Sequence, residues 1–130
     1  MKKKKKKKPP TGTLKKMADK VFSVWIRQRG MDEHGFNSCY TCGARKHWKE
    51  LQAGHYVSRA YLTLRYEPKN VKPQCLACNL FKKGNLDVYA IRLIEEYGQG
   101  ILKELHELKY QYEKFGVVRY SEIIKEFKYA

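Results

Sequence analysis

Apolar residues recur at helical spacing in four stretches of the chain. They predict helices over residues 14–30, 85–98 and 101 to about 115, and a last helix after Ser121. Asn85 is expected to cap the second of these helices and Gly98 to end it. The apolar stripes are expected to form the core; the alternative is that the C-terminal stripes bind a partner or a second copy.

Residues 37–80 lack sustained helical periodicity, and short extended pieces are expected near residues 52–57. This region carries two Cys-x-x-Cys pairs, Cys39/Cys42 and Cys75/Cys78. Each pair supplies two ligands from one tight turn, which suits tetrahedral zinc. All four cysteines are used, so such a zinc would be structural rather than catalytic. Disulfides between the same cysteines are the alternative, which a reducing compartment disfavours.

The chain has 130 residues and a formal net charge of +15. This length supports one domain with a modest core, which a metal would help to stabilise. Lys2–Lys8 carry seven of the positive charges, which leaves +8 for the rest of the chain. Residues 1–13 are expected to form a disordered lysine-rich arm, either native or an added tag. The remaining basic charge favours nucleic-acid phosphates, with a solvated charged face as the alternative.

No stretch of the sequence has the length and apolar character of a transmembrane span. The lysine run is followed by Pro9 and Pro10 rather than by an apolar segment, so it does not have the pattern of a secretory signal. We therefore expect a cytoplasmic protein with reduced thiols and no membrane partner.

The two cysteine pairs enclose Gly54-His55-Tyr56 and Asn70, and Asn79 directly follows the second pair. This grouping resembles the HNH, or ββα-metal, endonuclease motif. More narrowly, the motifs Ala18-Asp-Lys-Val-Phe-Ser, Gly54-His-Tyr-Val-Ser-Arg and Pro73-Gln-Cys-Leu-Ala-Cys-Asn are similar to those of the NinG/Rap family of phage recombination endonucleases. The resemblance covers roughly residues 14–98.

The resemblance implies an α+β fold built on a zinc-stapled ββα core. Two antiparallel strands and a short helix starting near Cys78 would form this core, preceded by the N-terminal helix. Residues 14–98 are expected to be the HNH-like nuclease core and residues 99–130 a C-terminal helical extension. The implied setting is the cytoplasm of a bacterium that carries the phage.

Phosphodiester hydrolysis requires a base that deprotonates water, and His55 is the natural candidate because imidazole titrates near working pH. The resemblance makes Asn79 a ligand of a catalytic Mg²⁺ or Mn²⁺ ion, and gives Asn70 the role of orienting the loop and the base. The alternatives are that His55 is simply a satisfied polar residue, that Asn79 caps a helix and that Asn70 is a loop residue.

One position departs from the broad HNH pattern, in which an aspartate or histidine that binds metal commonly precedes the base. Gly54 has no side chain to offer, so the second metal ligand is open, with Glu50 and Gln52 the nearest oxygen donors in sequence. The basic residues expected to bind DNA are Arg59, Arg65, Lys82 and Lys83. For the two arginines the alternative is ordinary ion pairing, for instance with Glu67.

The sequence thus predicts a metal-dependent DNA endonuclease with structural Zn²⁺ and catalytic Mg²⁺ or Mn²⁺. The resemblance implies branched recombination intermediates, such as D-loops and Holliday junctions, as substrates, and includes homo-oligomerisation among the expectations. One alternative is a non-catalytic zinc-ribbon module that binds nucleic acid. Another is a helical interaction protein whose zinc is purely structural.

Overall fold

The computed structural model describes residues 10–130, and most of the predicted lysine-rich arm lies outside them. Helix α1 covers Thr11–Gln28, so residues 11–13, assigned to the arm from the sequence, are helical. The helix begins earlier than predicted because the Leu14 amide donates to the Pro10 carbonyl at 3.1 Å, which closes a first turn directly after the proline. It ends as expected before Gly30, whose φ of 82° lies in the left-handed region.

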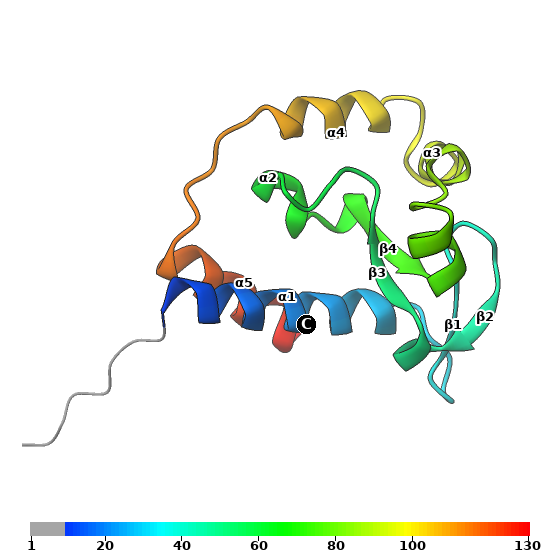
Figure 1. The fold of residues 1–130 in the computed structure, drawn as a ribbon, viewed down its shortest axis with the longest axis horizontal. Coiled ribbons are helices and arrows are strands. Elements are labelled where there is room, and N and C mark those ends of the chain that lie inside the picture. The colour runs from blue at the N-terminus through cyan, green and yellow to red at the C-terminus, as the bar shows by residue number, and fades with distance from the viewer. Residues whose placement is uncertain (1–9) are drawn as a thin grey trace, which may run out of the picture.

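Helix α5 covers Val117–Lys128 and lies along α1, so that helices from the two ends of the described chain pack together (Figure 1). It begins four residues before Ser121, whose hydroxyl donates to the Val117 carbonyl at 2.7 Å inside the helix rather than marking its start. Phe22 and Phe127 meet edge to face, with ring centroids 4.8 Å apart. The buried members of this cluster are Leu14, Ala18, Phe22, Ile26, Tyr66, Val71, Tyr120, Ile123 and Phe127.

Helices α2 (Leu62–Arg65), α3 (Leu86–Tyr97) and α4 (Ile101–Lys109) enclose a second cluster. Its buried members are Leu64, Tyr89, Leu93, Ile101 and Leu105. Helix α4 ends at Lys109 rather than near Phe115. The chain leaves the helix there and carries Phe115 across to the α1–α5 cluster, where its ring lies 6.1 Å from that of Tyr66.

Asn85 precedes α3 as predicted, but its side chain does not cap the helix. Its φ of 47° turns the residue into the left-handed region, and its amide instead donates toward the Cys78 sulfur at 3.7 Å. The expected cap was therefore wrong, because the side chain is used by the cysteine cluster. Gly98 ends α3 as expected, with a φ of 91°.

Between α1 and η3 the chain forms two antiparallel strand pairs. Strands β1 (Phe36–Ser38) and β2 (Arg45–His47) form a hairpin that the sequence did not predict, because three-residue strands are too short to show alternation. Strands β3 (Gln52–His55) and β4 (Val71–Gln74) pair so that Gly54 lies opposite Lys72 and His55 opposite Val71. Short turns η1 (Trp48–Glu50) and η2 (Pro68–Asn70) precede β3 and β4.

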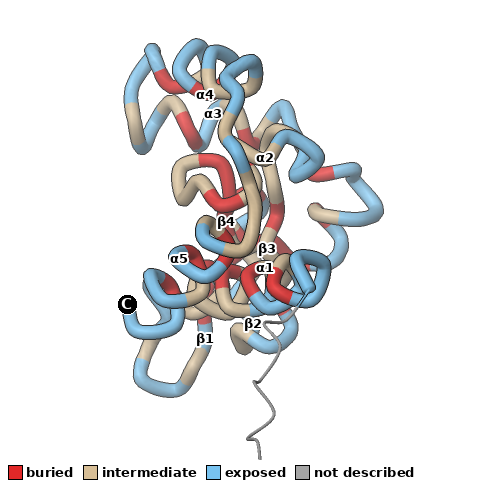
Figure 2. The backbone as a smooth tube through the Cα atoms, turned by 90° about the vertical axis from the view of Figure 1, so that its left-hand side faces the viewer, coloured by how far each residue is buried: buried red, intermediate tan, exposed pale blue. Residues whose placement is uncertain are grey.

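After β4 comes η3, a single turn of π-helix over Ala77–Phe81. Two antiparallel strands and a short helix near Cys78 thus follow each other in the expected order. The fold is α+β, with its two terminal helices packed together and a four-cysteine cluster beside η3. Buried residues gather where α1, β3 and β4 meet and again beneath α3 and α4 (Figure 2). None of the helices in residues 10–130 is long and apolar enough to cross a membrane.

Candidate functional site

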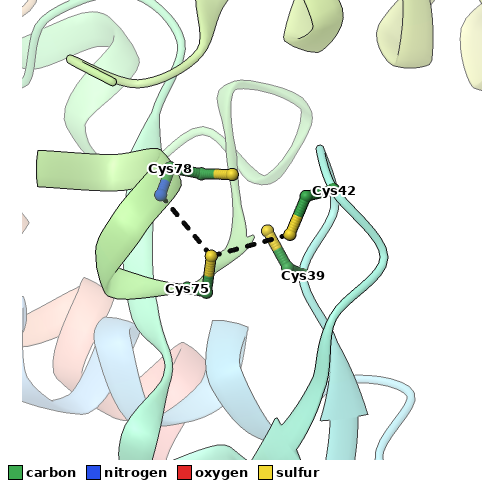
Figure 3. Close-up of side chains that lie close together, drawn as sticks. All are labelled: Cys39, Cys42, Cys75 and Cys78. Atoms are coloured by element: carbon green, nitrogen blue, oxygen red, sulfur yellow. Dashed lines mark hydrogen bonds between the residues drawn. The ribbon is translucent and has the colours of Figure 1, made fainter. Parts of the chain in front are cut away.

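The sulfur atoms of Cys39, Cys42, Cys75 and Cys78 converge, and all lie within 4.8 Å of one another (Figure 3). The Sγ atoms of Cys42 and Cys75 are 3.6 Å apart. Four thiolates at about 2.3 Å from one zinc ion would be separated by roughly 3.8 Å, so the arrangement fits tetrahedral zinc. The predicted cysteine cluster is confirmed, although its two halves are 33 residues apart in the chain at Cys42 and Cys75.

Backbone N–H groups surround the sulfurs. The amides of Ala44 and Cys78 point at the Sγ atoms of Cys42 and Cys75, at 3.4 and 3.5 Å. Burial of Cys39 opposes its ionisation, but hydrogen bonds from the Cys42 backbone and the Thr41 side chain bring the pKa of this thiol down to about 6. The first thiolate of the cluster is thus stabilised by the protein itself.

Gln74 joins the two halves of the cluster from within. Its Nε2 donates to the Thr41 hydroxyl at 3.2 Å and to the Gly84 carbonyl at 2.9 Å, and the residue is fully buried. Gly54 lies directly against it, since a Cβ added to Gly54 would come within 1.8 Å of Gln74 Oε1. The absence of a side chain at position 54 is therefore a packing requirement here, and any metal ligand must come from another position.

A cleft of about 500 Å³ lies between α1, β3 and η3. Its charged lining consists of Arg27, Arg59 and Arg65 against the single carboxylate of Asp19, so the cleft is positive. The residues that line it are Asp19, Phe22, Ser23, Arg27, Leu51, Gln52, Ala53, His55, Arg59, Arg65, Tyr66 and Asn79. The structure thus brings together the predicted His55, Asn79, Arg59 and Arg65 although they span 25 residues of sequence.

His55 lies at the end of β3, with its Nε2 2.9 Å from the Arg65 carbonyl oxygen. A carbonyl oxygen only accepts, so Nε2 carries the proton and Nδ1 keeps its lone pair. Burial lowers the pKa of His55, and the positive charges of Arg65 and Arg59 lower it further, against the opposing effects of hydrogen bonds to the backbone of Arg65 and of Ala53. At neutral pH the ring is therefore a neutral imidazole in one fixed tautomer.

Asn79 projects into the cleft from η3, one residue after buried Cys78. Its Nδ2 donates to Gln52 Oε1 at 2.6 Å, which fixes the orientation of the amide. Its Oδ1 has no hydrogen-bond partner among residues 10–130, so a neutral oxygen donor stands free at the cleft wall. Of the two other oxygen donors considered from the sequence, Gln52 lines the cleft and Glu50 does not.

Asn70 is fully buried beneath the cleft and does not line it. Its side chain accepts from the Val57 amide at 2.8 Å and donates to the carbonyls of Val57 and Leu64 at 2.9 and 3.1 Å. These bonds tie the loop after β3 to the turn before β4. Leu64 directly precedes Arg65, so the bond to the Leu64 carbonyl restrains the backbone next to the Arg65 carbonyl, which accepts the hydrogen bond from His55 Nε2. The role of Asn70 in orienting the loop and the base stays a prediction.

Two charged cleft residues, Asp19 and Arg27, were given no role from the sequence, although Asp19 stands in the motif Ala18-Asp-Lys-Val-Phe-Ser. The Asp19 carboxylate accepts from Arg65 at 2.8 and 2.6 Å, in a bidentate pair, and from the Tyr66 hydroxyl at 2.7 Å. Burial opposes ionisation of Asp19, but these hydrogen bonds outweigh it and lower the pKa of the carboxyl. The signal available in the sequence was that Asp19 is the only acidic residue before Asp32.

The predicted DNA-binding residues occupy different places. Arg59 is exposed at the cleft edge, whereas the Arg65 guanidinium is largely buried by its pair with Asp19 and also donates to the Arg59 carbonyl. The partner of Arg65 is thus Asp19 and not the Glu67 considered from the sequence. Lys82 and Lys83 are exposed just beyond η3, outside the cleft lining. DNA binding by all four residues stays a prediction.

Comparisons with known proteins give the chain a family. The NinG family, described as bacteriophage lambda NinG protein, matches residues 1–130. Over 100 residues, 71% of this chain, it is 33% identical to the proteins named ninG of Escherichia phage lambda, Escherichia phage 933W and Salmonella phage P22. That region is 48% of the lambda protein and 49% of the other two, so the match spans about half the length of these curated relatives. No solved structure matches the chain with significance. The chain belongs to the NinG family of bacteriophage proteins.

Proposed function

We propose that this NinG-family chain is a metal-dependent DNA endonuclease of the HNH, or ββα-metal, type. One observation carries the proposal: a neutral histidine of fixed tautomer and a free amide oxygen face the same positively charged cleft. Hydrolysis of a phosphodiester needs a base for the attacking water and a site that neutralises phosphate charge. His55 and Asn79 supply groups of these two kinds.

His55 acts as the general base through Nδ1. Its Nε2–H is held by the Arg65 carbonyl, so the ring cannot rotate without losing that bond. When Nδ1 takes a proton from water, the carbonyl oxygen 2.9 Å from Nε2 stabilises the imidazolium that forms. Asn70 fixes this carbonyl indirectly, through its bond to the neighbouring Leu64 carbonyl.

Asn79 Oδ1 is the proposed protein ligand of the catalytic cation. A Mg²⁺ or Mn²⁺ ion bound there would neutralise charge on the phosphate and stabilise the leaving 3′ oxygen. Gln52 orients Asn79 by accepting its Nδ2–H. Gln52 is also the proposed second oxygen donor at the cleft wall, since packing against Gln74 leaves no room for a side chain at position 54.

Zinc is proposed for the four-cysteine cluster. It supports the site because Asn79 directly follows Cys78, so the metal fixes where η3 begins and how the asparagine enters the cleft. The cluster has no role in the reaction itself, because zinc bound by four cysteines has no open position for substrate.

Nucleic acid is the proposed partner because the cleft and its surroundings are positive. Arg27, Arg59 and Arg65 face the cleft and Lys82 and Lys83 lie beside it, which favours binding to phosphates by release of counterions. Branched recombination intermediates, such as D-loops and Holliday junctions, are the proposed substrates, and assembly of several copies on them is part of the same proposal.

A second candidate function is a nucleic-acid-binding module without catalysis. The observation that favours it is that the cleft offers few anionic metal ligands. Among the described residues, Asp19 is the only carboxylate in the lining, and Arg65 donates to both of its oxygens. The two candidates differ in whether added Mg²⁺ or Mn²⁺ produces cleavage.

The deciding experiment compares wild type with His55→Ala on labelled branched and linear DNA, with and without Mg²⁺ or Mn²⁺. Removing a general base is expected to slow cleavage about 100- to 10,000-fold while DNA affinity changes little. His106→Ala, on the exposed side of α4, is the matched control and should cleave like wild type. Wild-type protein that binds but never cleaves would select the second candidate, and full cleavage by the His55 variant would reject the proposed base.

A further inference from the structure

Exposed apolar side chains and two lysines lie at and beside η3, and the proposed function uses only the lysines. We define the η3 tip as Leu76, Leu80, Phe81, Lys82 and Lys83. The exposed fractions are 75% for Phe81, 60% for Leu80 and 44% for Leu76, and both lysines are exposed. Unlike the isolated Tyr112, Phe81 is adjacent in sequence to another exposed apolar side chain and to two lysines, and exposed apolar residues that are grouped in this way are typical of interaction sites.

The backbone holds the η3 tip in one conformation. The Lys82 amide donates to the Ala77 carbonyl at 2.9 Å, five residues back, which widens the turn and carries Phe81 outward. Lys83, Gly84 and Asn85 then follow with φ of 50°, 91° and 47°. Such left-handed conformations persist in non-glycine residues only where the surroundings impose them.

Those surroundings are the cysteine cluster. The Gly84 amide donates to the Cys78 carbonyl at 2.8 Å, and the Asn85 side chain donates toward the Cys78 sulfur. The η3 tip is therefore anchored on the same residue that fixes Asn79 at the cleft, and Phe81 has little freedom to fold back onto the protein.

The chemistry of the η3 tip points to unpaired nucleotides. An exposed aromatic ring stacks on a base face, and adjacent lysines contact the phosphates that flank it. Base faces inside a duplex are already stacked on their neighbours, so only an unpaired base offers its face to a ring at the surface. We propose that Phe81 stacks on an unpaired base of the DNA substrate, an inference that rests on the proposed function for its choice of partner.

The position of Phe81 gives this contact a use. Asn79 is half-buried and lines the cleft, whereas Phe81, two residues later in the same turn, is exposed and does not line it. Side chains two residues apart on a helical turn project toward nearly opposite sides of it. A strand whose phosphate reaches Asn79 and a base stacked on Phe81 therefore lie on different sides of η3. That arrangement suits DNA whose strands diverge, with η3 between them, and it makes Phe81 a residue that selects substrates with unpaired bases.

The test measures binding in buffer without added divalent ions, so that cleavage plays no part. A forked DNA with 2-aminopurine at its unpaired branch position is compared with a duplex of the same sequence, using zinc-loaded full chain. Phe81→Ala is expected to weaken fork binding about tenfold and duplex binding less than twofold, with loss of the 2-aminopurine quenching that stacking causes. Phe81→Trp should keep the preference for the fork, and Phe81→Leu, which is apolar but cannot stack, should lose it.

Tyr112→Ala is the matched control, because Tyr112 is an aromatic residue 90% exposed in the connection between α4 and α5. It should bind both DNAs like wild type. The inference is overturned if wild type does not bind the fork, if Phe81→Ala keeps the wild-type ratio of fork to duplex affinity, or if Phe81→Leu keeps it. It is also overturned if Phe81→Ala turns a wild-type dimer into a monomer without DNA, since a second copy would then cover the tip.

Cleavage with Mg²⁺ or Mn²⁺ is measured separately on the same fork. Wild type that binds the fork through Phe81 but cuts nothing would refute the proposed endonuclease and leave the stacking contact established. The opposite outcome is that wild type cuts the fork and that Phe81→Ala keeps the wild-type ratio of fork to duplex in both cleavage and binding. That outcome would refute the stacking contact and leave the proposed endonuclease unaffected.

Discussion

Gly54→Ala is expected to weaken the protein far from any reacting atom. Gly54 is paired with Lys72 between β3 and β4, and its Cα faces the fully buried side chain of Gln74. An added methyl group would lie 1.8 Å from Oε1, 2.6 Å from Cδ and 2.8 Å from Cγ of Gln74. Three atoms of one side chain are too close, so Gln74 itself must move.

The loss of stability follows from the packing and the hydrogen bonds of Gln74. Forcing a methyl group into a packed interior costs about 1–3 kcal/mol. Moving Gln74 also breaks its hydrogen bonds to Thr41 and Gly84, each worth about 1 kcal/mol when its partners stay buried. We therefore expect the free energy of unfolding to fall by about 3–5 kcal/mol. Because Thr41 lies between Cys39 and Cys42, and the Gly84 amide donates to the Cys78 carbonyl, zinc should also leave faster.

Urea unfolding of the zinc-loaded protein and the rate of zinc transfer to a chromogenic chelator measure both effects. Gly100→Ala is the matched control, since an added Cβ there meets no atom within 4 Å and its φ is an ordinary −78°. In the double variant Gly54→Ala/Gln74→Ala the side chain that clashes with the added methyl group is gone. This variant should be no less stable than Gln74→Ala alone, so the two effects should depart from additivity by about 3–5 kcal/mol. Unfolding of Gly54→Ala within 0.5 kcal/mol of wild type, or strictly additive effects, would refute this account.

Three further predictions concern the metal, the cleft and the basic arm. Substituting Cys75 by Ser should abolish stoichiometric zinc, measured by elemental analysis, and destabilise the fold far more than substituting exposed Lys82; folded protein without zinc would contradict this. Asp19→Asn should lower the free energy of unfolding by about 2 kcal/mol at pH 7, because the pKa of Asp19 is lowered in the folded state. The ionised carboxylate stabilises the fold above its unfolded pKa near 4, and this stabilisation is lost as pH falls through the folded pKa, so the acid-unfolding curves of wild type and variant should converge. Deleting Lys2–Lys8 should weaken DNA binding and flatten its dependence on salt without moving the cut sites, as gel mapping at several salt concentrations would show; new cut sites would mean that the arm selects the substrate.

The cysteine cluster could be predicted from sequence because each half of it consists of two cysteines only three positions apart in the chain. A Cys-x-x-Cys pair places two sulfurs on one turn whatever surrounds it, and two such pairs need only meet. The role of His55 was predicted from the chemistry of imidazole and from its Gly-His context, and that of Asn79 from resemblance. The structure places both on one cleft, and their roles stay predictions. The helices α1 and α3 were found because their apolar stripes are long and their ends carry glycines.

The remaining features depend on contacts between distant segments. Asp19 meets Arg65 across 46 residues, and nothing in either neighbourhood marks them as partners. Gly54 looked like a missing metal ligand because the side chain that excludes a Cβ is on the opposite strand. Helix α4 was predicted too long because Tyr112 continues its apolar stripe, although the ring is exposed and the chain has already turned toward the α1–α5 cluster.

The packing of α5 against α1 sets the order in which the molecule can be completed during its synthesis. The β3–β4 pair and the cysteine cluster have all their residues by position 78, and β3 and β4 already contact α1. The apolar face of α1 is covered completely only once residues 117–128 have left the ribosome. Until then Phe22 of α1, the helix that carries Asp19, packs on Tyr66 but lacks its contact with Phe127. A nascent chain therefore acquires its cleft late, and truncation before Val117 would disable the site without removing a single residue that lines it.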